Sequence, residues 1–289
     1  MYVFLDGIQA KPEVVRAIKY LYDHYKIKFF LSGSSSFYIK NLFPESLIDK
    51  KFIFELCPLA FEEFLLFRDK NGKFGPSLNQ QNKNKNQTFY ESTRKFYDEY
   101  LEYCGFPEVV LTKQSKNKIL KIKDIFKSYF EKDVKNLAAF SKINSFRDLI
   151  LLLAHLNGEK LDITRLSSEI GVSRMTVYSY LSFLKETYFI RLVSPFSRNV
   201  NRKISGTKKV YFCDHGIANH CVRVDKERLF KNCVFNNLIK LGRVNYYQKR
   251  SGEEINFILN KRIGIEVKMM GLESNLRKLN KICKKIGLN

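Results

Sequence analysis

The hydrophobic positions at the start of the chain switch between strand-like and helix-like spacing. An apolar run at residues 2–5 is followed by a helical pattern at 12–25 and a second apolar run at 27–31, which ends in the small-residue loop 32–36. Buried strands of a parallel sheet form short continuous apolar runs, and parallel neighbours need a crossover between them. The pattern therefore predicts one βαβ unit of a parallel sheet.

The middle of the chain changes from a polar stretch to a helical pattern. Residues 69–95 are rich in Asn, Gln and Lys and poor in apolar side chains, which favours a surface insertion over a folded element. From residue 96 to about 156, apolar side chains recur at helical spacing. Beyond residue 215, helix-like and strand-like runs alternate again, which is typical of an α/β domain.

Residues 163–184 carry the most specific structural pattern, that of a helix-turn-helix. Gly171 lies where the turn needs a left-handed residue, and Ser173 can cap the second helix. The exposed start of that helix would face the major groove of DNA. Its candidate DNA contacts are Arg174, Thr176 and Ser179.

The segment after the helix-turn-helix is basic and resembles a hairpin. No acidic residue occurs between Arg191 and Lys209, so this segment would form a basic wing that contacts phosphates. Its candidate contacts are Arg198, Arg202 and Lys203. Many winged-helix domains serve only as packing modules, so a protein-interaction role stays open beside DNA binding.

Composition and charge fit a folded protein of more than one domain. The 289 residues are 45% hydrophobic and 14% aromatic, which excludes wholesale disorder. Lys and Arg number 51 against 29 Asp and Glu, and the formal net charge of +22 favours a polyanionic partner such as nucleic acid. A lysine-rich proteome would give the same bias, so charge alone leaves both interpretations open.

We expect neither a membrane segment nor a secretion signal. No apolar run approaches the roughly 20 residues that a membrane span needs. The opening residues 1–6 lack the basic region and cleavage site of a signal peptide. The 6 cysteines are scattered, without a CxxC pair, as is typical of reduced thiols. These features predict a cytoplasmic protein.

Short motifs spread over most of the chain resemble one family. Tyr-Val-Phe-Leu-Asp-Gly-Ile-Gln at 2–9 resembles a Walker B strand, and Ser-Gly-Ser-Ser at 32–35 resembles the sensor loop after the next strand. Further matches are Cys-Pro-Leu-Ala-Phe-Glu-Glu-Phe at 57–64 and the stretches 105–110, 131–133, 209–216 and 264–268. Together they resemble the AAA-type P-loop ATPases that carry a winged helix and a restriction-endonuclease-like C-terminal domain.

The resemblance implies ATP and Mg²⁺ as ligands, with Asp6 as the metal ligand and Ser32 and Ser34 as nucleotide-site positions. No G-x-x-x-x-G-K-[ST] sequence occurs, and Gly7 stands where the family has the glutamate that polarises water. We therefore expect an N-terminally truncated, diverged member that does not hydrolyse ATP alone. A separate polypeptide could supply the missing Walker A half.

The C-terminal residues resemble a degenerate endonuclease domain. Glu266 and Lys268 match the Glu-x-Lys of such nucleases and would project to the same face of a strand, which makes them catalytic candidates. Asn256 and Lys231, however, stand where relatives have acids. An amide binds Mg²⁺ less well than a carboxylate, so a structural or DNA-docking domain is favoured over an active nuclease.

The expected fold class is therefore α/β multidomain. The expected parts are a partial P-loop (AAA-type) α/β unit with a polar insertion at 1–95, a helical segment at 96–147, a winged helix-turn-helix at 148–214 and a restriction-endonuclease-like α/β domain at 215–289. The expected function is that of an ATP-binding protein with a DNA-binding winged helix. The alternatives are a nucleotide-independent DNA-binding regulator and a protein-interaction module.

Overall fold

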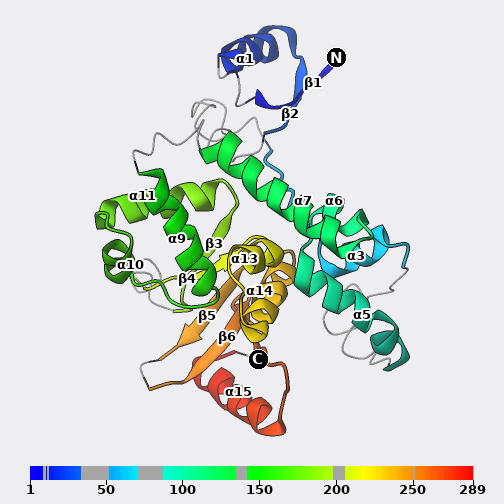
Figure 1. Cartoon of the computed structure of the whole chain (residues 1–289). Coiled ribbons are helices and arrows are strands. Elements are labelled where there is room, and N and C mark those ends of the chain that lie inside the picture. The colour runs from blue at the N-terminus through cyan, green and yellow to red at the C-terminus, as the bar shows by residue number, and fades with distance from the viewer. Residues whose placement is uncertain are drawn as a thin grey trace.

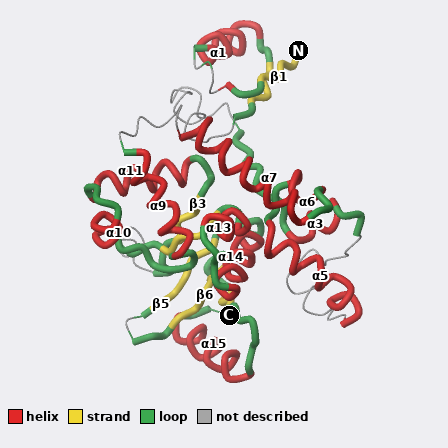
Figure 2. Tube along the Cα trace, viewed as in Figure 1, coloured by secondary structure: helices red, strands yellow, loops and turns green. Residues whose placement is uncertain are grey.

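A computed structural model gives the fold of the chain (Figure 1). The structure describes residues 1–8, 11, 13–33, 52–70, 87–134, 142–197, 206–249 and 251–288. Helices and small sheets alternate along these parts, so the chain is a mixed α/β protein (Figure 2). No helix in the described ranges is long and apolar enough to cross a membrane.

The N-terminal elements form the expected βαβ unit. They are β1 (Tyr2–Leu5), α1 (Val14–Tyr25) and β2 (Lys28–Leu31). The two strands pair in parallel, with Tyr2 opposite Lys28. Lys26 ends α1 in the left-handed conformation, and its N–H donates to Tyr22 O, so the chain enters β2 two residues later. This unit lies at one end of the molecule (Figure 1).

A group of helices follows the N-terminal unit. They are α3 (Phe61–Phe67), α5 (Gln87–Tyr103), α6 (Pro107–Leu111), α7 (Ser115–Ser128) and a π-helical turn, η3 (Tyr129–Val134). Residues 87–95, which the sequence placed in the polar insertion, are the first turns of α5. They are helical because Phe89, together with Phe96 further along α5, packs on the hydrophobic cluster that contains Phe64 of α3.

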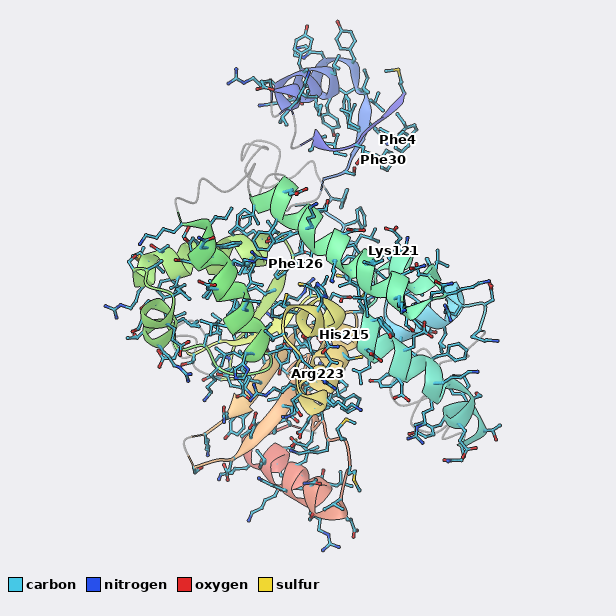
Figure 3. All side chains as sticks on the ribbon, viewed as in Figure 1. Phe4, Phe30, Lys121, Phe126, His215 and Arg223 are labelled. Atoms are coloured by element: carbon cyan, nitrogen blue, oxygen red, sulfur yellow. The ribbon has the colours of Figure 1, made fainter. Side chains whose placement is uncertain are left out.

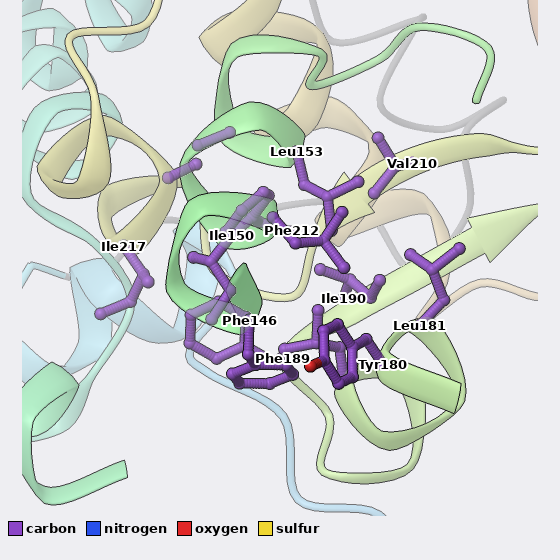
Figure 4. Packing of buried hydrophobic residues seen from close by; sticks show 14 of the residues in the cluster. Phe146, Ile150, Leu153, Tyr180, Leu181, Phe189, Ile190, Val210, Phe212 and Ile217 are labelled. Atoms are coloured by element: carbon purple, nitrogen blue, oxygen red, sulfur yellow. The ribbon is translucent and has the colours of Figure 1, made fainter. Parts of the chain in front are cut away.

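The next elements enclose one hydrophobic core. They are α9 (Ile143–His155), α10 (Ile163–Glu169), α11 (Arg174–Glu186) and the antiparallel pair β3 (Ile190–Val193) and β4 (Lys209–Phe212). Phe146, Leu153 and Phe212 are fully buried in this core (Figure 4). The ring of Phe146 meets Tyr180 of α11 edge-on, with centroids 5.1 Å apart. The core therefore joins α9 and α11 to the β3–β4 pair.

The C-terminal elements form a three-stranded antiparallel sheet with helices on both faces. They are α13 (His215–Cys221), α14 (Lys226–Leu238), β5 (Val244–Gln248), β6 (Glu254–Leu259), β7 (Ile263–Ile265) and α15 (Glu273–Ile286). Phe257 of β6 packs in one cluster with Phe235 of α14, whereas Ile258 packs in another with Ile282 of α15. Burial of both faces explains why β6 has nearly continuous apolar residues.

Candidate functional site

Asp6 and Ser32 come together at the carboxyl ends of β1 and β2. Each directly follows the last residue of its strand, and parallel strands end at the same edge of a sheet. The Ser32 hydroxyl donates a hydrogen bond to Asp6 Oδ1, and the Ser32 N–H donates to Leu5 O. Gly7 has a φ of 67° and turns the chain away from β1 directly after the carboxylate.

The side-chain oxygens of Asp6 and Ser32 lie at this edge of the sheet. In open α/β sheets, ligands bind at the carboxyl ends of the strands, and Mg²⁺ in such sites is held by one or two carboxylates together with phosphate oxygens. Asp6 fits that role as a single ligand. Ser34 lies outside the described residues. Among the residues whose placement is described, no group of three His, Cys, Asp or Glu side chains could hold a metal ion.

One face of the β1–β2 sheet is apolar and open to solvent. Phe4 and Phe30 stack with ring centroids 4.8 Å apart and remain 74% and 54% exposed (Figure 3). Helix α1 instead buries Val15 and Ile18. An exposed apolar face of this kind marks a surface for a further structural element or a partner.

The Glu-x-Lys match lies beside α14. Lys268 Nζ is 3.7 Å from Glu266 Oε1 and 3.8 Å from Glu227 Oε1, and Lys231 Nζ is 3.0 Å from the same Glu227 oxygen. The hydrogen bond from Lys231 lowers the pKa of Glu227, whereas burial raises the pKa of Glu266. Glu227 was missed by the sequence reasoning. The feature of the sequence that could have indicated Glu227 is its position one helical turn before Lys231.

These side chains do not fit a catalytic Mg²⁺ site. Lys231 and Lys268 form ion pairs with Glu227 and Glu266. A bound Mg²⁺ would need these carboxylate oxygens as its own ligands. The Asn256 Oδ1 accepts a hydrogen bond of 2.7 Å from the Val267 N–H, so this amide holds β6 to the segment after β7. The cluster is consistent with an ion-paired surface joining α14 to the sheet, and we derive no metal-dependent step from it.

The turn between α10 and α11 is built as the sequence predicts. Gly171 has a φ of 65°, and the Ser173 hydroxyl accepts a hydrogen bond of 3.1 Å from the Thr176 N–H at the start of α11. The Thr176 hydroxyl lies 2.9 Å from the Ser173 hydroxyl and is half-buried, so it is engaged in this cap. Of the three expected DNA contacts on α11, Arg174 and Ser179 are exposed.

The exposed face of α11 also carries apolar side chains. Met175 is 75% exposed and Tyr178 is 54% exposed, beside Arg174. The sequence reasoning did not single out Met175, because an apolar residue at helical spacing is usually assigned to a core. The expected wing contacts lie outside the described residues; they are Arg198, Arg202 and Lys203.

Two family models match the chain. The model described as AAA domain matches residues 1–65, and the model described as Domain of unknown function (DUF8612) matches residues 94–228. The first match supports an AAA-type ATPase-like unit in the part of the chain that holds Asp6 and Ser32. The second includes α10 and α11.

Several curated proteins are similar to this chain. An uncharacterized protein of Methanocaldococcus jannaschii is 26% identical over 268 residues, which are 89% of this chain and 58% of that protein. An uncharacterized protein of Haemophilus influenzae is 22% identical over 269 residues, 90% of this chain and 63% of that protein. One of Mycobacterium tuberculosis is 22% identical over 98 residues, 34% of this chain and 22% of that protein. The chain thus spans about six tenths of the first two relatives, and no solved structure matches it.

Proposed function

We propose that this chain is an AAA-type ATP-binding protein that contacts DNA through α11 and does not hydrolyse ATP by itself. The observation that carries this proposal is the pairing of Asp6 with Ser32 at the carboxyl edge of β1 and β2, inside the segment that matches the AAA domain. Asp6 would hold Mg²⁺ together with the phosphate oxygens of ATP. Gly7 has no side chain to activate water, which favours ATP binding without turnover.

The unpaired edge and the exposed face of the β1–β2 sheet support the proposal that a further strand, carrying the Walker A loop, completes the site. In the described ranges the sheet has only two strands, and Phe4 and Phe30 expose its apolar face. A strand edge without a neighbour readily pairs with another chain. In such a completed site the Walker A loop would face the edge that holds Asp6 and Ser32, and this chain alone would bind ATP through Mg²⁺ on Asp6.

Binding of a fluorescent ATP analogue tests the role of Asp6. N-methylanthraniloyl-ATP would be titrated into the full chain with and without Mg²⁺, with Asp6→Asn as the variant and Asp148→Asn on α9 as the control. Asparagine keeps an oxygen that accepts the Ser32 hydroxyl but weakens the metal ligand, so we expect a Mg²⁺-dependent affinity that falls about tenfold in Asp6→Asn alone. Equal affinity of the two variants would contradict the proposal.

The DNA part of the proposal is supported by the exposed start of α11 and by the charge of the chain. Arg174 and Ser179 are exposed there, and the formal net charge is +22. A helix N-terminus with an exposed arginine matches the docking of helix-turn-helix proteins in the major groove. Each phosphate or base contact made by a cation would also make the affinity salt-dependent.

A salt titration of DNA affinity tests this part. Fluorescence anisotropy with a labelled duplex would compare the wild type with Arg174→Ala, and Arg16→Ala on α1 would serve as an exposed-arginine control. We expect Arg174→Ala to weaken binding about tenfold and to lower the slope of log affinity against log salt by about 1. The control should match the wild type.

A protein-interaction module is the second candidate, because Met175 and Tyr178 are exposed on the same face of α11. Exposed apolar side chains together with a single arginine are more typical of a protein interface than of a phosphate-binding surface. If DNA affinity is equal in the wild type and Arg174→Ala, this second candidate replaces DNA binding.

A further inference from the structure

A cavity of about 440 Å³ opens between β3 and the start of β5. Beyond β3, Ser194 O accepts a hydrogen bond of 3.3 Å from the Tyr246 N–H, and the Phe196 N–H donates to Tyr246 O at 2.6 Å. These bonds join the chain after β3 to β5 in parallel. The residues of β3 and β5 that line the cavity precede these bonded residues in the sequence. Arg243, directly before β5, lines the cavity as well. Lys185 and Glu186 at the end of α11 also line it, at the opposite end of that helix from Arg174.

The backbone edge of β3 faces this cavity. The Cys213 N–H donates to Phe189 O at 3.1 Å, so Phe189 and Cys213 form a hydrogen-bonded pair. In the antiparallel pairing of β3 with β4, every second pair from there on is hydrogen-bonded. Because alternate residues of such a strand turn their N–H and C=O groups to opposite sides, those of Ile190 and Leu192 point away from β4. Both residues line the cavity. The edge of β3 therefore presents backbone N–H and C=O groups to a ligand in the cavity.

The base of the cavity is apolar. Ile190 and Phe235 are buried to 0% and 2% exposure, and Val193 is 3% exposed. Ile239, directly after α14, and Val244 of β5 also belong to this apolar lining. An aromatic or aliphatic group placed here would lose its contact with water, which favours binding by about 25 cal/mol for each Å² of apolar surface.

Three cations and two carboxylates line the cavity: Lys185, Arg191 and Arg243 beside Glu55 and Glu186. Glu186 Oε1 accepts a hydrogen bond of 3.0 Å from the Ser182 hydroxyl, and Glu55 pairs with Arg191. Arg243 lines the mouth and is exposed, and no ion pair of its side chain is found among the described residues. Arg191 Nη2 lies 3.1 Å from Glu55 Oε2, and the Tyr188 hydroxyl donates to Glu55 Oε1 at 3.2 Å. Arg191 Nε is buried without a hydrogen-bond partner in the described parts. Because Nε is shielded from solvent, an acid that enters the cavity would meet Arg191 by competing with Glu55 for Nη2.

The end of α11 places Tyr188 in the wall of the cavity. Tyr188 has a φ of 56° because it follows the C-cap of α11: the Phe189 N–H donates to Leu184 O at 2.9 Å and the Tyr188 N–H to Lys185 O at 3.3 Å, the Schellman pattern that favours a left-handed residue here. This helix end positions the Tyr188 hydroxyl against Glu55 at the cavity.

We propose that this cavity binds a small organic anion with an aromatic or aliphatic body. Its acidic group contacts Arg191 and Arg243, its body lies on the apolar base, and Glu55 is an internal competitor for Arg191. The volume lies within the range of roughly 300–1,000 Å³ that is usual for small-molecule sites. The chemistry of Glu55 defines the class, because a carboxylate already occupies one side of the arginine fork.

Binding of 8-anilinonaphthalene-1-sulfonate to the full chain tests the proposal, because this dye joins a sulfonate to an aromatic body. The chain has no tryptophan, so the emission of the dye is read without that background. We expect Arg243→Ala to raise the dissociation constant about tenfold, as loss of a charge-assisted contact does. Glu55→Gln should lower the constant by about threefold, because it weakens the internal competitor. Arg223→Ala, an exposed arginine elsewhere, is the matched control.

A pair of competitors separates the charge from the apolar body. 1-Naphthoate should displace the dye from the wild type at a concentration about tenfold lower than neutral 1-naphthylmethanol. Arg243 is exposed and Glu55 lies at the surface, so neither substitution removes core packing, and circular dichroism verifies the fold. Equal dissociation constants for the wild type, Arg243→Ala and Glu55→Gln would overturn the proposal, as would equal displacement by the two competitors.

Discussion

Gly216 lies at the closest backbone contact between α13 and the end of α5, and replacing it with alanine tests that contact. A Cβ at Gly216 would lie 2.2 Å from Tyr103 O and 2.4 Å from the Cβ of Cys104. The neighbouring Asp214 is buried and accepts hydrogen bonds from the Gly105 N–H at 2.9 Å and from an N–H of α13 at 3.0 Å. Gly216 therefore sits where two backbone segments are already held together.

The cost of this substitution follows from the atoms that the methyl group meets. Ordinary Cβ contacts begin at 3.4 Å, so one backbone segment must move by about 1 Å. Overpacking of a core costs about 1–3 kcal/mol, and the upper end applies because backbone atoms cannot rotate away. The same movement stretches the Gly105 to Asp214 hydrogen bond, which is worth about 1 kcal/mol. We expect a loss of about 3–4 kcal/mol in the free energy of unfolding.

Urea unfolding followed by circular dichroism measures the loss, and hydrogen exchange of the peptide at 100–106 locates it. The Gly105 amide should exchange faster in Gly216→Ala, because its acceptor moves away. Gly271→Ala is the matched control, since nothing lies within 4 Å of a Cβ at Gly271. A loss below about 1 kcal/mol in Gly216→Ala, with unchanged exchange of that peptide, would refute the reasoning.

Three further substitutions test other contacts. Ser173→Ala removes the cap of α11 and should cost about 1 kcal/mol in thermal unfolding, a loss that Ser173→Asn should avoid. Burial is the largest single cause and raises the pKa of Glu63, but the hydrogen bonds from Lys240 and the Ala60 N–H and the charge of Lys240 together lower it by more, so the net pKa lies below its ordinary 4.5. The stabilisation is therefore present above pH 4.5 and lost as the pH falls, so Glu63→Gln should be less stable than the wild type at pH 7 and equal to it at pH 3. Lys118→Met removes the partner 3.0 Å from Glu99 Oε1 and should cost about 2 kcal/mol in urea unfolding, and an unchanged midpoint would contradict the pairing.

Local signals explain the features that could be predicted from the sequence. The βαβ unit follows from apolar runs separated by a helical pattern, and the proximity of Asp6 and Ser32 follows because parallel strands end at one edge. Gly171 and Ser173 adopt the predicted turn and cap because both effects act over three or four residues. The division of the chain into four domains stays a prediction, as do the DNA contacts.

Other features depend on contacts that no short pattern records. Residues 87–95 have few apolar side chains, yet they are helical because Phe89 packs on the cluster that contains Phe64 of α3 and the rest of α5 continues the helix. Glu227 reaches Lys268 only because α14 lies beside the end of the sheet. Periodicity reports which face of one element is apolar, and it does not report which other element covers that face.

The sequence by itself therefore determined the type of most elements, the turn before α11 and the edge that holds Asp6. Only the tertiary structure decided which residues meet across long separations, such as the Gly105 N–H with Asp214, 109 residues apart, and Glu55 with Arg191, 136 residues apart. The reason is physical. Helix propensity, capping and strand periodicity act between near neighbours, whereas these contacts form only after whole elements have packed and excluded water.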